Sequence, residues 1–361
     1  MMNNEEIDHD PYSHLKRDIL NNVITIFHMM DQNVILRTEK LTLIVNYSLA
    51  SICLHPISIG SQIRKRWVTS ILRYLTKIKE GRLEIKSLIR LLNNLSHQSQ
   101  ESKILVFKGE NISNILMKYL SYLDTLRLII TLCSGTDPSI IINGQLFNGI
   151  VNIASKYRSE EGIYALKILI IIAANSSEIR SMIYKSNFLT GENSKSSPIL
   201  FEALDPKGFK KKRSKYLILT LDLLLTVTSF QDGQIYVPSK CQGVMDYLLL
   251  SLVRNRNDIV SIAILRNISF HSSNRARMLF CKNFLLILRD IFLNASTLND
   301  SKLLEICFQI VWSICHNSLK AKGTLRNAGV TESIEDLFNR SKVHLKLNSS
   351  LICNVNKVLG I

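Results

Sequence analysis

The feature of this sequence that most limits its fold is an apolar segment with helical spacing that recurs along the chain. The segment closes each time on small or polar residues and is followed by a polar break. The clearest copies are Leu88–Ser96, Ile262–Ser269 and Phe308–Cys315, and weaker copies end near Ser48, Cys133, Ala174 and Thr228. Successive copies end 37 to 54 residues apart, so the chain repeats one structural unit.

The spacing and the composition together predict an all-α fold. Fourteen glycines and six prolines in 361 residues leave little turn chemistry for an all-β fold. An interval of roughly 40–47 residues is typical of armadillo and HEAT units, each of two or three helices. We therefore predict an armadillo/HEAT-like right-handed helical solenoid. An irregular helical bundle with coincidental spacing is the alternative.

The polar breaks predict how each unit begins and ends. Three blocks share a long helix, a break, a short helix and a second helix that begins at Asn111, Asn283 or Thr331. These short oxygen-bearing side chains fit as N-caps. Pro138 and Pro238 are expected to lie in breaks, where a missing N–H costs nothing.

One stretch interrupts the repeats and predicts the domain organisation. Residues 191–215 are polar at first and strongly basic at the end. They predict an inserted loop between amino-terminal repeats in residues 1–190 and carboxy-terminal repeats in residues 216–361.

The net charge of +16 favours acidic partners, although a basic protein can also use such a charge only for solubility. The candidate basic patch in the inserted loop contains Lys207, Lys210, Lys211, Lys212, Arg213 and Lys215. It would bind acidic protein tails or nucleic acid, or it is a solvated loop. Nucleic acid is the less favoured partner, because aromatic residues are not interleaved with the basic ones.

Seven scattered cysteines without a C-x-x-C motif argue against a disulfide framework and against zinc, and for a reducing compartment. The amino terminus is acidic and polar, so no secretory signal is expected. The longest apolar stretches are far shorter than the roughly 20 residues of a membrane-spanning helix. We expect a cytoplasmic protein without a membrane span.

No motif supports catalysis, a cofactor or a metal. The eight histidines lack the sequence contexts of metalloproteases and other known sites, and His97, His271 and His316 are expected to lie at helix ends. The sequence therefore predicts a protein that is not an enzyme.

Protein binding is the function that the repeats favour. Asparagines near the ends of the long helices can bind the backbone of an extended peptide, because an amide offers a donor and an acceptor together. An arginine and a tryptophan nearby would add a charge-assisted bond and a stacking surface. The alternative is that these residues only end helices, where asparagine is common. The candidate protein-binding residues are Asn94, Asn175, Arg266, Asn267, Trp312 and Asn317.

Two stretches resemble a known family. Ile264–Arg277 reads ILRNISFHSSNRAR and resembles the end of an armadillo repeat in the rotatin family, which includes insect anastral spindle 3. Val311–Arg326 reads VWSICHNSLKAKGTLR and resembles that family's carboxy-terminal pattern LW-x-L…N-x-x-K-A-K-x-x-L. The resemblance covers about residues 255–340.

The resemblance implies a non-enzymatic, armadillo-like scaffold that binds other proteins in centrioles and ciliary basal bodies. Its expected location is then the cytoskeleton, at the centrosome. Family members are much longer, so the chain would be a carboxy-terminal portion, a short isoform or a truncated gene model.

Overall fold

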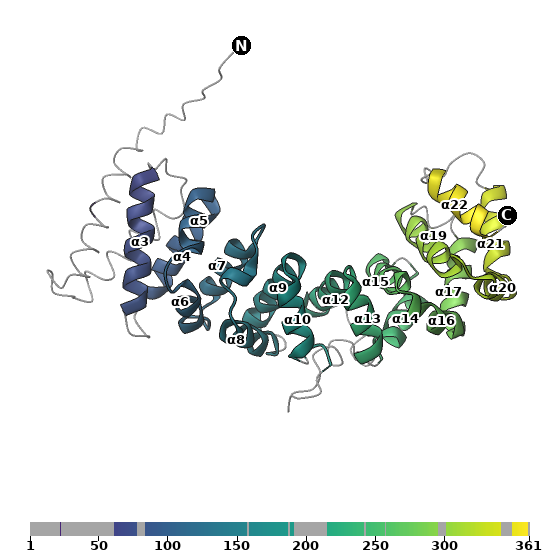
Figure 1. The fold of residues 1–361 in the computed structure, drawn as a ribbon, viewed down its shortest axis with the longest axis horizontal. Helices are drawn as coiled ribbons and strands as arrows, with labels where there is room; N and C mark the ends of the chain where they lie inside the picture. Colours follow the sequence, from purple (N-terminus) through teal and green to yellow (C-terminus); the bar gives the residue numbers. More distant parts are fainter. Residues whose placement is uncertain are drawn as a thin grey trace, which may run out of the picture. The chain divides into compact units, whose positions relative to one another are not determined.

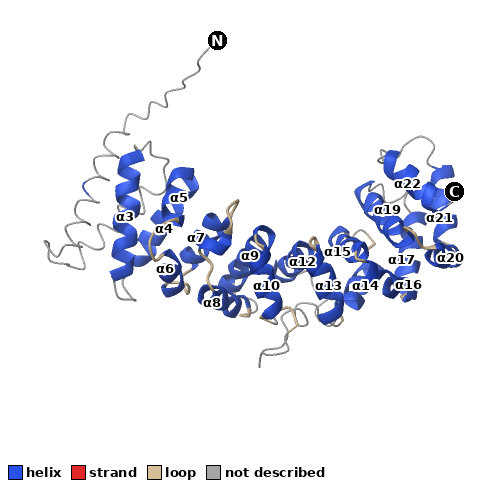
Figure 2. Cartoon of the chain, viewed as in Figure 1, coloured by secondary structure: helices blue, strands red, loops and turns tan. Residues whose placement is uncertain are grey.

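The computed structural model describes residues 61–77, 84–156, 159–186, 188–190, 215–241, 243–256, 258–294, 301–340 and 349–359, apart from an isolated helical position at residue 22. Across these ranges the regular structure is helical and contains no strand (Figure 2). The predicted inserted loop, except for Lys215, lies outside the described residues. So does the repeat expected to end near Ser48.

The helices fall into two compact units, residues 1–179 and 180–361, and the division lies within α10. The first unit contains α3 (Ser61–Lys77), α4 (Glu84–Gln98), α5 (Gln100–Phe107), α6 (Ile112–Lys118), α7 (Leu123–Cys133), η1 (Pro138–Ile140), α8 (Gly144–Ala154), α9 (Glu160–Asn175) and the start of α10 (Ser177–Lys185). The second contains the rest of α10 and α12 (Lys215–Thr228), α13 (Gln231–Lys240), α14 (Val244–Arg254), α15 (Ile259–Phe270), α16 (Ser272–Phe280), α17 (Lys282–Leu293), α19 (Ser301–Cys315), α20 (Leu319–Asn327), α21 (Val330–Arg340) and α22 (Ser349–Leu359). The predicted domain boundaries at 190 and 216 stay a prediction.

Each unit repeats one three-part element: a long helix, a short helix and a second helix (Figure 1). The triplets are α4–α5–α6 and α7–η1–α8 in the first unit, and α12–α13–α14, α15–α16–α17 and α19–α20–α21 in the second. Every predicted repeat ending within the described ranges falls at the end of a long helix or within its last turn. This order is that of armadillo-type units, and the all-α repeat prediction is confirmed.

The long helices pack against one another in sequence. In the first unit α4 packs against α7 and α7 against α9, and in the second α12, α15, α19 and α22 follow in the same way. The second helices form a parallel layer, in which α6 packs against α8, and α17 packs against both α14 and α21. The long helices are therefore covered on two sides, which explains why α19 is buried almost all round. No triplet buries its apolar residues alone, as expected of a repeat array.

The structure corrects two local predictions. Helix α17 begins one residue before Asn283 and α21 one residue before Thr331, so neither residue is an N-cap. Asn111 does occupy the N-cap position of α6, but with φ 60° and without a side-chain bond to the helix. Side chains that do cap include those of Ser99, Asn143, Ser159, Asp258 and Ser318, because their oxygens reach an amide of the first turn.

Pro238 lies inside α13 and not in a break. Its missing N–H would leave the carbonyl of Gln234 without its helical partner. Asn274 of α16 supplies the donor instead, because its Nδ2 lies 2.8 Å from that carbonyl and 2.9 Å from the carbonyl of Ile268. The sequence did not show this compensation because the donor comes from the next repeat. Pro138, by contrast, opens the short helix η1 as a proline at a helix start can.

Candidate protein-binding surface

In the first unit the long helices carry a row of cations and aromatic rings, here called the cationic–aromatic row. It consists of Lys86 and Arg90 on α4, Tyr122 at the N-cap of α7, Arg127 on α7, and Tyr164 and Lys167 on α9. The Lys86 ammonium lies 5.4 Å from the centre of the Tyr122 ring, and the Lys167 ammonium 5.1 Å from that of Tyr164. These distances are those of cation–π pairs. The row thus offers charge and ring faces together across three helices.

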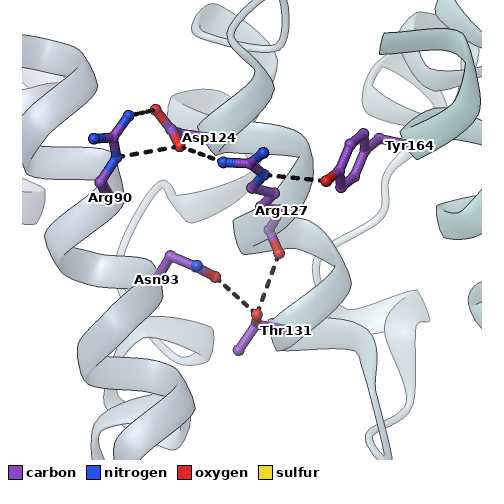
Figure 3. Close-up of polar contacts among 6 residues, drawn as sticks. All are labelled: Arg90, Asn93, Asp124, Arg127, Thr131 and Tyr164. Carbon is purple, nitrogen blue, oxygen red and sulfur yellow. Dashed lines mark hydrogen bonds and ion pairs between the residues drawn. The ribbon is translucent and has the colours of Figure 1, made fainter. Parts of the chain in front are cut away.

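Asp124 organises this row (Figure 3). Its carboxylate accepts two hydrogen bonds from Arg90, at 3.1 and 3.4 Å, and one from Arg127 at 3.4 Å. The Asp124 side chain is only 10% exposed, whereas that of Arg90 is 53% exposed. A carboxylate this buried needs such partners. Asp124 therefore holds two guanidinium groups whose outer edges remain accessible to solvent.

The neighbouring contacts extend this network across the long helices (Figure 3). Arg127 Nε donates to the Tyr164 hydroxyl at 3.4 Å, and this hydrogen bond is the main reason why the pKa of Arg127 is raised. The Thr131 hydroxyl lies 2.7 Å from Asn93 Oδ1 and joins α7 to α4. The network sets the register of α4, α7 and α9 and fixes the side chains of the row.

In the second unit Arg266 and Asn267 form an internal bracket between long helices. Asn267 is 2% exposed, and its Nδ2 lies 3.3 Å from both Thr228 Oγ1 and Ser229 Oγ at the end of α12. Its Oδ1 accepts from Arg266 at 2.7 and 3.1 Å, and Arg266 also donates to Gln309 of α19 at 3.3 Å. Burial lowers the pKa of Arg266, and Glu305 opposes that shift.

The other predicted binding residues lie at different depths. Asn94 is half-buried on α4, and Asn175 is exposed but donates to the carbonyl of Ile171 in its own helix at 2.8 Å. Trp312 is partly exposed, and its ring centre lies 5.1 Å from that of His316 with the rings tilted by 38°, while exposed Asn317 lies in the turn after α19 with φ 60°. The structure joins Arg266 with Asn267 and places Trp312 one turn before Asn317. The binding role of all six residues stays a prediction. For Asn267 it would require this buried side chain to break its hydrogen bonds with Arg266, Thr228 and Ser229.

Other sequence-based expectations concern charge, metals and thiols. Of the candidate basic patch only Lys215 is described, and it is exposed at the start of α12. Within the described ranges no three His, Cys, Asp or Glu side chains gather as a metal site would require. No described helix has the length and apolar character needed to cross a bilayer. Burial raises the pKa of Cys133 to about 12. It also raises the pKa of Cys315 to about 11, because its effect is larger than the opposite effect of Lys322.

The cationic–aromatic row is not apparent from the sequence, because its members come from three repeats and pair across 34 and 37 residues. A signal was present, because Lys86 and Arg90 are spaced by four residues and Tyr164 and Lys167 by three, so each pair shares one face of its helix.

The relatives of this chain are found by sequence and by structure. No family model matches the sequence. Human rotatin is 25% identical over 205 residues, which are 56% of this chain and 9% of rotatin. Mouse rotatin is 24% identical over 198 residues, 54% of this chain and 8% of the relative. The chain therefore covers less than a tenth of the length of these relatives.

Three solved structures share the fold. An engineered protein has a TM-score of 0.63 at 15% identity, covering 99% of this chain and 90% of its own. A structure from work on the phosphorylation switch that controls the interaction between cadherin and β-catenin also has a TM-score of 0.63, at 10% identity. The match covers 92% of this chain and 60% of that chain. She4p has a TM-score of 0.62 at 12% identity, and the match covers 96% of this chain and 52% of She4p. The chain is thus similar to rotatin in sequence over a little more than half of its length, on an armadillo-like helical-repeat fold.

Proposed function

We propose that this chain is a non-enzymatic scaffold that binds other proteins and serves the assembly and organisation of centrioles and ciliary basal bodies. The observation that carries this proposal is the similarity to rotatin over 205 residues. The fold supports it, because repeat arrays expose extended surfaces without enclosing a catalytic cleft. Its place in the cell is then the cytoplasm, at the centrosome and the ciliary base.

The cationic–aromatic row is the proposed docking surface. Four cations and two tyrosines lie along three adjacent helices, and Asp124 fixes the arginines before a partner arrives. Aromatic and arginine side chains dominate binding at protein interfaces. Because the arginines are already held in place, little side-chain entropy is lost when they bind.

Localisation of the tagged full chain in ciliated cells tests this function. The unmodified chain is expected at the centrosome and basal body. The double variant Lys86→Glu/Lys167→Glu reverses two charges of the row and is expected to lose that focus. A matched control, Lys156→Glu/Lys185→Glu, makes the same charge change at exposed positions off the row.

The outcomes separate the levels of the proposal. Diffuse signal from the unmodified chain would contradict the centriolar role. Loss of the focus in the control as well as in the row variant would contradict the assignment of the row as the docking surface.

A further inference from the structure

A second exposed surface lies in the second unit, around the turn between α19 and α20. Its most unusual members are Phe280, the last residue of α16, and Leu319, the first residue of α20. They are 79% and 85% exposed, more than any other large apolar side chain in the described ranges. Helices α16 and α20 pack against each other, and the two residues line neighbouring cavities that share part of their lining.

Each of these two residues lines a cavity. The first cavity, about 430 Å³, lies between α16 and α20 and is lined by Phe280, Arg275 and Lys320 among others. The second, about 480 Å³, lies on the other side of the turn and is lined by Leu319, Trp312 and Lys357 among others. His316, Asn317 and Ser318 line both. Pockets of this size accept an anchoring side chain of a partner.

The charged residues of this surface are all basic. Helices α16 and α20 contain Arg275, Arg277, Lys320, Lys322 and Arg326 and no Asp or Glu. None of these five cations forms an ion pair with a carboxylate of the described residues. Arg275 and Arg277 donate to backbone carbonyls, and the Lys320 ammonium lies 5.8 Å from the centre of the Phe280 ring. Exposed apolar side chains thus lie at the two cavities, and positively charged side chains surround them.

We propose that the α16–α20 surface binds an acidic segment of another protein through an aromatic or aliphatic anchor. The anchor enters beside Phe280 or Leu319, and carboxylates before and after it meet the cations of α16 and α20. Charge complementarity selects an acidic partner. The exposed apolar side chains favour a protein segment over nucleic acid, whose backbone would leave them in water. The site rests on the proposed scaffold function, because it gives that scaffold one class of partner.

Selection from a random 16-residue peptide library displayed on phage, with the full chain as bait, tests the proposal. The enriched peptides are expected to be acidic and to contain an aromatic or large aliphatic residue. Synthetic versions are then measured by fluorescence anisotropy. Phe280→Ser/Leu319→Ser and Lys320→Glu/Lys322→Glu are each expected to weaken binding about tenfold or more. All four changes are at partly or fully exposed positions, and circular dichroism checks that the variants fold.

Matched controls test whether the effects are specific to this surface. Ile140→Ser removes an apolar side chain that is 68% exposed, and Lys156→Glu/Lys185→Glu makes the same charge change at exposed positions outside both proposed surfaces. Neither should change peptide affinity. If the chain reaches the centrosome but selects no acidic peptides, this site is wrong and the scaffold function stands. If the chain binds acidic peptides at this surface but shows no centrosomal focus, the centriolar function is wrong and this binding site stands.

Three further outcomes would overturn the proposal. The first is enrichment of neutral or basic peptides only, or of acidic peptides whose affinity both surface variants leave unchanged. The second is binding of a labelled 20-nucleotide RNA or DNA that the same lysine variant abolishes. The third is a dimer in mass photometry that Phe280→Ser/Leu319→Ser converts to monomer, because the occupant would then be a second copy of the chain.

Discussion

At the residue scale, the carboxylate of Asp222 in α12 differs from that of Asp124, which two arginines hold. Asp222 is half-buried, and no hydrogen bond or ion pair joins its carboxylate to a described side chain. Burial raises its pKa above the ordinary value, because the charged form loses hydration. Asp222 therefore reduces stability wherever it is ionised.

The pH dependence of this effect has a definite sign. Between the ordinary and the raised pKa the folded chain holds a proton that the unfolded chain has released, so stability falls as pH rises through that window. We expect Asp222→Asn to raise the melting temperature at pH 7 and to have little effect near pH 3. Thermal unfolding at both pH values measures this. Asp246→Asn, at an exposed position of α14, should bring no gain at pH 7, and an equal gain in both variants would contradict the burial explanation.

Asn274 and Pro238 form a coupled pair. Asn274→Ala leaves two buried carbonyls without a donor and should cost about 2 kcal/mol. In the Pro238→Ala background the new N–H of residue 238 can bond to the carbonyl of Gln234, so the same change should cost about 1 kcal/mol less. Urea unfolding of the four chains gives the coupling energy. Strict additivity would show that Asn274 does not replace the missing proline donor.

At the element scale, two helical glycines have opposite roles. A Cβ on Gly233 of α13 would lie 2.0 Å from the carbonyl oxygen of Val227 at the end of α12. Gly323 of α20 is exposed, and a Cβ there meets nothing within 4 Å. The first glycine permits the close approach of two helices, and the second only weakens its helix.

Substitution by alanine should therefore change stability in opposite directions. Gly233→Ala is expected to lower the free energy of unfolding by at least about 1 kcal/mol, because backbone must move. Gly323→Ala is expected to raise it by up to about 1 kcal/mol through helix propensity. Denaturant unfolding compares both with the unmodified chain. Similar losses in both would show that the α12–α13 approach is not the constraint.

At the scale of the whole molecule, contacts within each unit join mainly neighbouring repeats. In such an array a destabilising substitution lowers the local stability of the adjoining helices first. Leu265→Ala in α15 removes a fully buried side chain and should cost about 2–5 kcal/mol.

Hydrogen–deuterium exchange should show which helices lose stability in the Leu265→Ala variant. We expect faster exchange in α12, α15 and α19 and unchanged exchange in α4 and α7 of the first unit. Leu319→Ala, at an exposed position of the same unit, should leave all of them unchanged. Equal acceleration throughout the described helices would indicate one cooperative body instead of a repeat array.

The sequence by itself determined the elements and their order. Apolar spacing of helical period, closing on Ser96, Ser269 and Cys315, marked the long helices, because burial on two sides requires apolar residues nearly all round. The same pattern fixed the repeat length, and the VWSICHNSLKAKGTLR stretch pointed to rotatin.

The tertiary structure alone decided which side chains meet. Asp124 finds Arg90 across 34 residues, Asn274 replaces the donor that Pro238 lacks, and Phe280 and Leu319 line two neighbouring cavities around the turn between α19 and α20. Single-chain periodicity shows that a helix has an apolar side. It does not show how far neighbouring repeats are rotated or shifted, and that packing geometry determines every contact between them.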